Sequence, residues 1–444
     1  MNIATLVLMA SQFCVSSAEI PWSFIVFADP HNFETFASKN EAHPWYKTAY
    51  SQNVAGVSYI KQTYGGEVVV IPGDTNSGKW YLPSFAKKIG EPSLTPIEAI
   101  LKASHGCYST LRKVFAEGGY EEVMVSIGDH ELGGNGWDAN SPKKAVIEYY
   151  RDGFQKELNR DDNGHFLYND PIGHASSRPI ETRYKNTSYA RIYKNALFVT
   201  VDCFHVENEN FIDRNNGLGG EGSVTVSVEG DHLSWFINVL REARNDPIIK
   251  HVIVQAHIPI LQPVRKVVSS GQFFDRGSES DFWLAMREYK VDLYLTGEVH
   301  ATTASIDPDP DSNLLQIASR GNQFNNFLSV AVGDDFISVK AYNEIGKKPK
   351  GNHNYTEFGN IYVNKTDSET KIESNGVLAI LDSNAALLKF RFEDMFSMGM
   401  QQVQGMKDKG NMILSNITVR NVLCSEAMKN EGALGGKLPK VNML

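Results

Sequence analysis

Residues 123–137 read VMVSIGDHELGGNGW, an apolar run that stops at Gly128 and is followed by Asp129, His130 and Glu131. The apolar part has the composition of a buried β-strand, and the three polar side chains can bind a metal ion or exchange a proton. In open α/β sheets, ligands bind beyond the carboxyl ends of the strands. The stretch therefore predicts a strand that ends in a functional site, although Gly-Asp also occurs in ordinary turns.

The same pattern recurs at four other places in the chain. Apolar runs end in a polar side chain at 22–28, 67–72, 251–256 and 292–296, and the side chains that follow are Asp29 with His31, Asp74, His257, and Glu298 with His300. A turn explains each of these ends separately but does not explain all five together. We therefore expect five strand ends to form one site.

Seven side chains at these ends are candidate metal ligands. They are Asp29, His31, Asp74, Asp129, His257, Glu298 and His300. Seven carboxylate and imidazole ligands exceed the needs of one metal ion and suit two neighbouring cations. Two-metal sites generate a hydroxide nucleophile and stabilise an in-line displacement at phosphorus. The pattern therefore favours metal-dependent chemistry on a phosphate ester.

The order of these motifs resembles that of the calcineurin-like metallophosphoesterase superfamily, which includes the purple acid phosphatases. The family series D-x-H, G-D, G-[ND]-H-[DE], V-x-x-H and G-x-x-H is similar to residues 29–31, 73–74, 128–131, 254–257 and 297–300. The resemblance extends through the strand pair from Phe327 to Tyr342 and says nothing firm about the residues after it. It implies an α/β fold, a four-layer sandwich of two mixed β-sheets flanked by helices.

The resemblance also implies a role for each motif residue. One metal ion would be held by Asp29, His31 and His300, the second by Asp129, His257 and Glu298, and Asp74 would bridge both. His130 would lie near the leaving group and act as the general acid, with Glu131 as its orienting partner. The expected cofactors are two divalent or mixed-valence metal ions, drawn from Fe, Mn, Zn or Ca.

Three positions depart from the family pattern. Asp129 replaces the usual Asn and Glu298 replaces the usual His, so two neutral ligands of the second metal become carboxylates. The added negative charge favours harder ions such as Mn, Ca or ferric iron over zinc. Ser77 replaces the Tyr of the purple acid phosphatases, so a purple iron centre is not expected. The alternative is a second site that has lost its catalytic role.

Composition limits the partners of the chain. It has 444 residues, of which 42% are hydrophobic, and this is enough for one large domain with an appendage. The formal net charge of -9 opposes binding to nucleic acid, so no nucleic-acid partner is expected. Beyond the amino-terminal run, no apolar segment is long enough to cross a bilayer, and no stable membrane association is expected.

Residues 1–18 are expected to be a secretory signal peptide. Ile3 to Ala10 is apolar, and Ser16, Ser17 and Ala18 provide small residues for cleavage, although no Lys or Arg precedes the apolar run. The alternative is a first β-strand of the mature fold. Secretion would make the chain extracellular, and four N-x-[ST] sequons permit glycosylation, at Asn186, Asn354, Asn364 and Asn416. Cys14 would leave with the signal, so Cys107, Cys203 and Cys424 allow at most one disulfide.

Helices and further strands occupy the sequence between the motifs. Thr95 to Glu98 is a capping box that predicts a helix to about Phe115, and helical spacing recurs over 231–244 and 281–289. The runs 327–332 and 336–342 predict an antiparallel hairpin. Arg320 follows another strand and is a further candidate for binding phosphate, because Arg binds phosphate in a bidentate manner.

We expect a metallophosphoesterase catalytic domain over residues 19–345. A linker-like basic segment follows Gly346, and after it short alternating runs predict a small β-rich C-terminal annex within residues 346–444. The residues after Met395 have weak periodicity and are expected to be partly disordered.

The sequence therefore predicts a secreted, metal-dependent phosphoric ester hydrolase that acts on a small-molecule phosphate ester. A phosphomonoesterase (phosphatase) is preferred, and a phosphodiesterase or nucleotidase of the same fold is the alternative. A protein of another class would keep a structural cation and bind a partner, but His130 disfavours this because a structural site needs no general acid. An intracellular enzyme with an uncleaved amino terminus is a further alternative.

Overall fold

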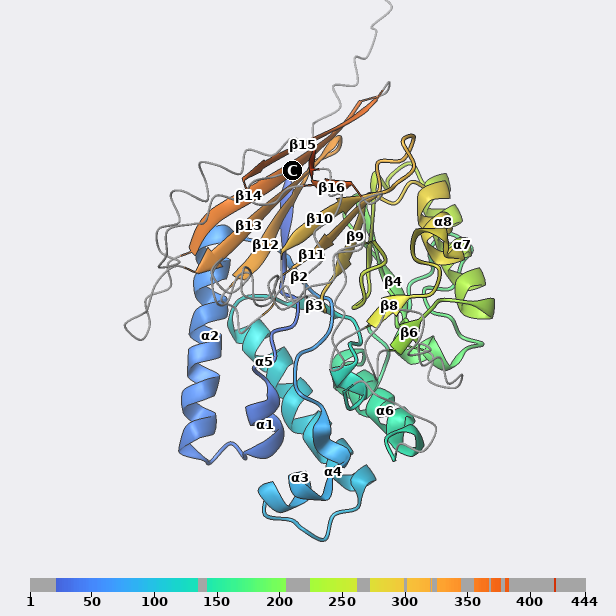
Figure 1. Ribbon diagram of the computed structural model, residues 1–444. Coiled ribbons are helices and arrows are strands. Elements are labelled where there is room, and N and C mark those ends of the chain that lie inside the picture. The colour runs from blue at the N-terminus through green and yellow to red at the C-terminus, as the bar shows by residue number, and fades with distance from the viewer. Residues whose placement is uncertain are drawn as a thin grey trace, which may run out of the picture.

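Two mixed β-sheets lie face to face between layers of helices (Figure 1). This computed structural model describes residues 21–134, 142–204, 224–261, 272–298, 302–319, 321, 326–344, 355–366, 369–376, 380–382 and 419–420. The predicted four-layer α/β sandwich is confirmed.

The first sheet has the strand order β15-β14-β13-β12-β1-β2-β3. Its strands are β1 (Trp22–Val26), β2 (Val68–Ile71), β3 (Glu122–Val125), β12 (Asn326–Val332), β13 (Phe336–Glu344), β14 (Tyr355–Lys365) and β15 (Thr370–Gly376). β1, β2 and β3 are parallel, so their carboxyl ends lie at the same edge. β12 and β13 pair antiparallel, which confirms the predicted hairpin.

The second sheet has the strand order β17-β16-β10-β11-β9-β7-β5-β4. Its strands are β4 (Tyr189–Tyr193), β5 (Ala196–Thr200), β7 (His251–Gln255), β9 (Leu293–Thr296), β10 (Thr303–Ile306), β11 (Leu315–Ala318), β16 (Ile380–Asp382) and β17 (Val419–Arg420). β5, β7, β9 and β11 are parallel neighbours. A separate short pair is formed by β6 (Val224–Val226) and β8 (Gln272–Phe274).

Both faces of the central strands are buried, which explains why these strands read as continuous apolar runs. Side chains alternate between two cores along β1 and the residue after it. Phe24 and Val26 pack in the core between the sheets, whereas Ile25 and Phe27 pack in the core beneath the helices. The strand register is therefore fixed on both faces, and the residue that follows each strand is placed with it.

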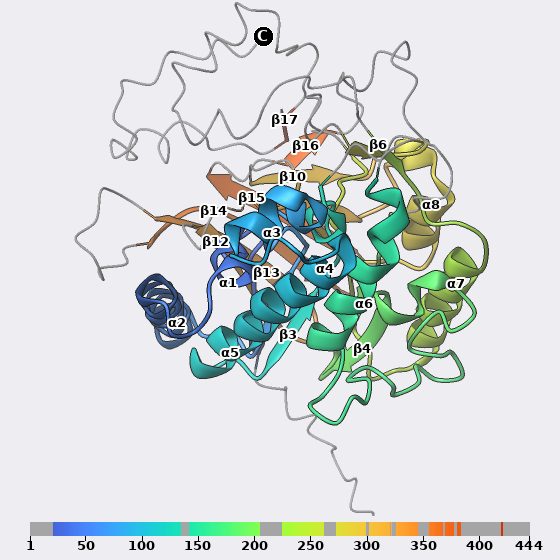
Figure 2. The same cartoon turned by 90° about the horizontal axis from the view of Figure 1, so that it is seen from below.

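Helices cover the outer faces of the sandwich. They are α1 (Glu34–Ser38), α2 (Pro44–Tyr64), α3 (Pro83–Lys88), α4 (Pro96–Ser104), α5 (Thr110–Glu117), α6 (Ile147–Leu158), α7 (Gly230–Asn245) and α8 (Asp281–Glu288). Short 3-10 helices are η1 (Lys79–Tyr81), η3 (His130–Leu132), η4 (Lys144–Val146), η5 (Arg183–Asn186) and η6 (Gly277–Glu279). Seen from below, α2, α5, α4 and α6 follow one another from left to right, and α7 and α8 lie at the right-hand side of the molecule (Figure 2).

The three predicted helices are confirmed. α4 starts at Pro96 with the capping box formed by Thr95 and Glu98, and it continues through one π-helical turn (His105–Ser109) into α5. α7 and α8 match the other two predicted segments. Cys107 and Cys203 are buried and free.

The strands after residue 345 belong to both sheets: β14 and β15 to the first, and β16 and β17 to the second. β14 pairs with β13, so the predicted domain boundary falls between two hydrogen-bonded neighbours of one sheet. Lys365 at the end of β14 also forms an ion pair with Asp292, which precedes β9 in the other sheet, at 2.5 Å. How the chain divides into domains stays a prediction. The described residues do not include the predicted signal peptide (1–18), His300, Arg320, Asn354, Asn416, Cys424 or most of the tail.

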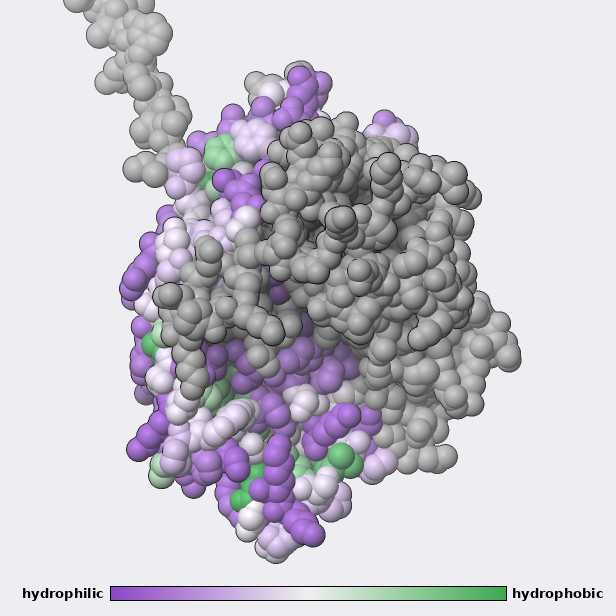
Figure 3. All heavy atoms as spheres, turned by 60° about the vertical axis from the view of Figure 1, so that its left-hand side comes forward, coloured by the Kyte–Doolittle hydropathy of each residue, from purple (hydrophilic) through white to green (hydrophobic). Residues whose placement is uncertain are grey.

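The described surface is mainly hydrophilic on the face shown in Figure 3, where the hydrophobic residues form small separate spots. Large exposed hydrophobic side chains include Trp45 (62%) in α2 and Ile248 (64%) in the segment between α7 and β7. Within the described ranges, no helix has both the length and the apolar character needed to cross a bilayer.

Candidate metal centre

Five strand ends lead into the candidate site. β1, β2 and β3 of the first sheet and β7 and β9 of the second each end two to four residues before a candidate ligand. The segments that follow β1 and β2 remain hydrogen-bonded to each other. Asp29 N donates to Gly73 O at 3.2 Å, and His31 N donates to Asp74 O at 3.0 Å. The ladder between the two strands therefore continues into the site.

Four candidate ligands have a strained backbone. Their φ angles are 42° at Asp29, 45° at His31, 55° at Asp74 and 62° at Glu298. A non-glycine residue in this left-handed region costs about 1–3 kcal/mol and persists only where the surrounding structure enforces it. Such strain is concentrated at functional sites, and here it occurs at residues that follow three different strands.

One group of ligand atoms is buried between the sheets. Asp74, Asp129, His257 and Glu298 each place one ligand atom within 4.8 Å of the others. Nε2 of His257 lies 3.3 Å from Asp74 Oδ2, 3.5 Å from Asp129 Oδ1 and 3.2 Å from Glu298 Oε2. This is the set that the family resemblance implies for the second metal ion, together with the shared Asp74.

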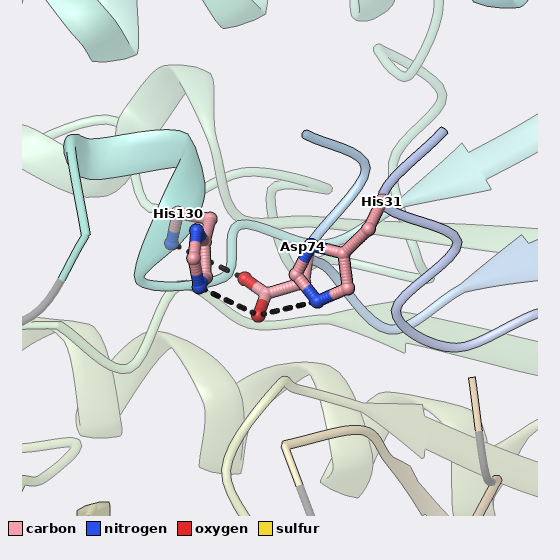
Figure 4. Close-up of side chains that lie close together, drawn as sticks. All are labelled: His31, Asp74 and His130. Carbon is pink, nitrogen blue, oxygen red and sulfur yellow. Dashed lines mark hydrogen bonds and ion pairs between the residues drawn. The ribbon is translucent and has the colours of Figure 1, made fainter. Parts of the chain in front are cut away.

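A second group lies on the solvent side of Asp74. Nε2 of His31 and Nε2 of His130 are both 3.7 Å from Asp74 Oδ2 (Figure 4), and their side chains are 25% and 26% exposed. Asp29 is buried, and its Oδ1 lies 3.6 Å from Nδ1 of His257. The structure therefore brings six of the seven candidate ligands into one region, and His300 lies outside the described residues.

One loop after β2 orients all three imidazoles. Each ring donates its Nδ1–H to a backbone carbonyl: His257 to Pro72 at 2.7 Å, His31 to Asn76 at 3.1 Å and His130 to Ser77 at 3.1 Å. A carbonyl only accepts, so Nδ1 carries the hydrogen, and the Nε2 of a neutral ring carries the lone pair that can bind a metal. The three Nε2 atoms all face Asp74 Oδ2. Such preset tautomers are typical of metal-binding histidines.

Glu131 does not orient His130, so the role implied by the family resemblance is corrected. Its buried carboxylate accepts hydrogen bonds from the backbone N–H groups of Asp74 (2.7 Å), Thr75 (2.9 Å) and Gly128 (2.9 Å). The side chains of Thr75 and Asn76 donate to it as well. Burial raises the pKa of Glu131 to about 7, and these donors oppose the shift. Glu131 therefore fixes the loop that carries Asp74.

The charges of the site fit bound cations. Burial disfavours the charged form of Asp74, but His257, His130 and His31 in their protonated forms outweigh it and hold the pKa of Asp74 well below its usual range. Asp129 and Glu298 add two further buried carboxyl groups beside it. Buried carboxylates require compensating positive charge. Three carboxylates and one imidazole in the buried group suit a hard cation better than zinc.

Two glycines leave the space that these carboxylates occupy. A Cβ on Gly128 would lie 2.2 Å from Asp74 Oδ1, and a Cβ on Gly297 would lie 2.1 Å from Asp29 Oδ1. Both distances are far below a van der Waals contact. No other residue type therefore fits either position without moving a candidate ligand.

Gly297→Ala is expected to displace Asp29 and to lower the affinity of the protein for the metal ion at Asp29 at least about tenfold. This is the lower end of the loss that follows when the groups around a metal ligand are altered. Chelator competition measures this affinity. Gly90→Ala is the control, because a methyl group there meets no atom within 4 Å; its φ of 81° strains the backbone, which should lower stability but not metal affinity. An unchanged affinity in Gly297→Ala would show that Asp29 holds no metal.

Solved structures of low sequence identity are similar to this chain. No family model matches the chain, and a search of curated proteins finds no match. The chain is similar to the solved structure of a purple acid phosphatase from yellow lupin (Lupinus luteus), with 12% identity, a TM-score of 0.43 and coverage of 79% of this chain and 55% of that one. It is also similar to a structure of PhoD, with 11% identity, a TM-score of 0.48 and coverage of 80% and 72%.

A third similar structure is a dimetal phosphatase from Danio rerio, with 15% identity, a TM-score of 0.42 and coverage of 72% of this chain and 95% of that one. The chain spans little more than half of the lupin phosphatase. Likenesses at such identities and TM-scores identify neither the substrate nor the activity, which depend on the side chains of the site.

Proposed function

We propose that the chain is a metal-dependent phosphoric ester hydrolase with a binuclear centre. The observation that supports this most is the position of Asp74, which is buried and shared by the two groups of ligand atoms. A carboxylate shared in this way can bridge two cations. Asp129, His257 and Glu298 would hold one cation, and Asp29, His31 and His300 the other. When bound, the metal ions supply a nucleophile from water and neutralise charge that develops at phosphorus.

The residues on the solvent side of Asp74 would meet the substrate. His31 and His130 are the partly exposed members of the site, and their rings lie 4.9 Å apart at an interplanar angle of 80°. With Nδ1–H fixed on Ser77 O, a protonated His130 would keep its Nε2–H beside Asp74 Oδ2, on the solvent side of that carboxylate, and donate this proton to the departing oxygen. We therefore propose His130 as the general acid.

Purified protein is expected to contain two metal ions per chain and to hydrolyse a phosphomonoester faster than the matched diester. The buried site should hold a hard ion, because Asp129 and Glu298 supply carboxylates. Elemental analysis and a parallel assay of the two esters test both points. Preference for the diester by orders of magnitude would favour a phosphodiesterase. Absence of metal under saturating conditions would contradict the proposal and favour a binding protein.

His130→Ala is expected to slow hydrolysis of an alkyl phosphate about 10²–10⁴-fold, the usual contribution of general acid catalysis. An aryl phosphate with an acidic leaving group should be affected far less, because its oxygen departs without a proton. Metal content should stay at the wild-type level. The control is His31→Ala, which should lose metal. If His130→Ala also loses metal, His130 is a ligand, as the equal 3.7 Å distances to Asp74 allow.

The proposal includes secretion and a small-molecule substrate. Support for secretion comes from the apolar run and small residues within 1–18, and sequencing of the mature amino terminus tests it. A first residue after Ala18 is expected. A chain that still begins at Met1 would favour the intracellular alternative.

A further inference from the structure

Glu34 lies one peptide unit away from the contact that orients His31. It is the first residue of α1, and its Oε2 accepts a hydrogen bond from the backbone N–H of Ser77 at 3.3 Å. That N–H belongs to the same peptide unit as the carbonyl of Asn76, which accepts the Nδ1–H of His31 at 3.1 Å. Two consecutive hydrogen bonds therefore join the carboxylate to the imidazole through one peptide.

We propose that Glu34 is a positioning residue that tunes His31 through the Asn76–Ser77 peptide, and this rests on the proposed metal-binding role of His31. A carboxylate bound to a peptide N–H polarises the peptide and makes its carbonyl a stronger acceptor. A stronger acceptor at Nδ1 fixes the Nδ1–H tautomer and makes Nε2 a better ligand. Metal-binding histidines often contact a carboxylate directly, whereas here a peptide lies between the two groups.

The arrangement distinguishes His31 from His257. The carbonyl of Pro72, which orients His257, belongs to a peptide whose N–H is that of Gly73. This N–H donates to the carbonyl of Ile71 at 2.8 Å, so the partner is a neutral backbone group. A change at Glu34 should therefore alter His31 and leave His257 unchanged, which provides a reference within the same molecule.

A buried indole is a second donor to the Glu34 carboxylate. Trp80 Nε1 donates to the same Oε2 atom at 3.0 Å. The Trp80 ring is fully buried and stacks on Tyr150, with a centroid distance of 5.7 Å and an interplanar angle of 19°. Trp80→Phe removes this donor but leaves the Ser77 contact and the charge of Glu34. It is therefore the matched control for a change of the carboxylate itself.

Glu34→Gln keeps the shape of the side chain and removes its charge. Two measurements on the full chain test it: ¹⁵N chemical shifts of the histidine rings in metal-free protein at one pH, and the affinity for Mn²⁺ by chelator competition. We expect a lower Nδ1–H population at His31, unchanged shifts at His257, and affinity lowered about 10–100-fold at one of the two sites. Trp80→Phe should change both measurements by much less. Equal effects of the two variants would mean that Glu34 only clamps the loop, which would overturn the inference.

The ring measurement needs no metal, so it separates this inference from the proposed function. If the wild-type protein binds no Mn²⁺ but Glu34→Gln still alters the ring shifts of His31, the result would contradict the binuclear centre and support the contact with Glu34. Wild-type protein that binds two ions, with an unaltered His31 in Glu34→Gln, would overturn the inference alone. If Glu34→Gln does not fold, Glu34→Asp withdraws the carboxylate from Ser77 and is examined by the same two measurements. In a His31→Ala background, Glu34→Gln should cause no further loss of affinity.

Discussion

Asp74→Asn is expected to release both metal ions and to lower the rate of phosphate-ester hydrolysis about a thousandfold or more. Asp74 Oδ2 lies 3.3 Å from Nε2 of His257 and 3.7 Å from Nε2 of His31, so it belongs to both groups of ligand atoms. An Asn side chain replaces one carboxylate oxygen by an NH₂ group, which cannot bind a cation. Metal ions contribute several kcal/mol of transition-state stabilisation, and each 1.36 kcal/mol is about tenfold in rate. Elemental analysis and kcat/KM measure the two effects.

The control for this prediction is Asp311→Asn, the same chemical change on an exposed loop. It should leave metal content and rate unaltered. Loss of only one metal ion in Asp74→Asn would show that Asp74 belongs to a single site. Wild-type metal content in Asp74→Asn would mean that the shared carboxylate is not a ligand and would remove the main support for a binuclear centre.

The central strands and their ligands could be predicted because they depend on local sequence. Most residues of β1, β2, β3, β7 and β9 are buried, so these strands are mainly apolar, and a candidate ligand follows each strand end within two to four residues. The buried group of ligand atoms contains three of the residues predicted for the second metal ion. Residue type and strand position predicted the candidate ligands, and the family resemblance implied how they divide between two metal ions.

The contacts that hold the imidazoles could not be predicted, because their partners are backbone carbonyls. Every residue has a carbonyl, so Pro72, Asn76 and Ser77 carry no signal of this role in the sequence. The partners of Glu131 could not be predicted for the same reason, because they too are mainly backbone groups. Three of its donors are backbone N–H groups, from residues 74, 75 and 128, and only the folded loop brings them together. The position of Glu34 likewise depends on how α1 meets the loop after β2.

Pairs far apart in the sequence were also missed. Arg151 of α6 and Asp202 after β5 are both buried, with exposures of 2% and 0%. Nothing in the sequence near either residue indicates the other, and charged residues are mostly exposed. The pairing of β14 with β13 in the first sheet was missed as well. An alternating pattern predicts a strand but does not specify its neighbour in the sheet.

Arg151→Met is expected to lower the free energy of unfolding by about 3–5 kcal/mol, because it leaves a buried carboxylate without its cation. Arg151 Nε donates to Asp202 Oδ2 at 2.9 Å, and Arg151 Nη2 donates to the carbonyl of Phe204 at 2.6 Å. Met has a similar length but replaces none of these donors. Urea unfolding followed by circular dichroism measures the change, and the thermal midpoint should fall as well.

The other ion pair of Arg151 provides the control. Glu148 contacts Arg151 Nη1 at 2.9 Å but is 54% exposed, so Glu148→Gln should cost only about 0–1 kcal/mol. Adding Asp202→Asn to Arg151→Met removes the stranded charge and should restore part of the stability, since Asn can still accept from Thr187, which donates to Asp202 at 2.8 Å. The Phe204 ring lies 6.4 Å from the ring of His257, so the pair also anchors the chain beside the buried ligands. If Arg151→Met and Glu148→Gln lower the free energy of unfolding equally, water must reach Asp202. The buried side of the centre would then be more accessible to solvent than the 0% exposure of Asp202 indicates.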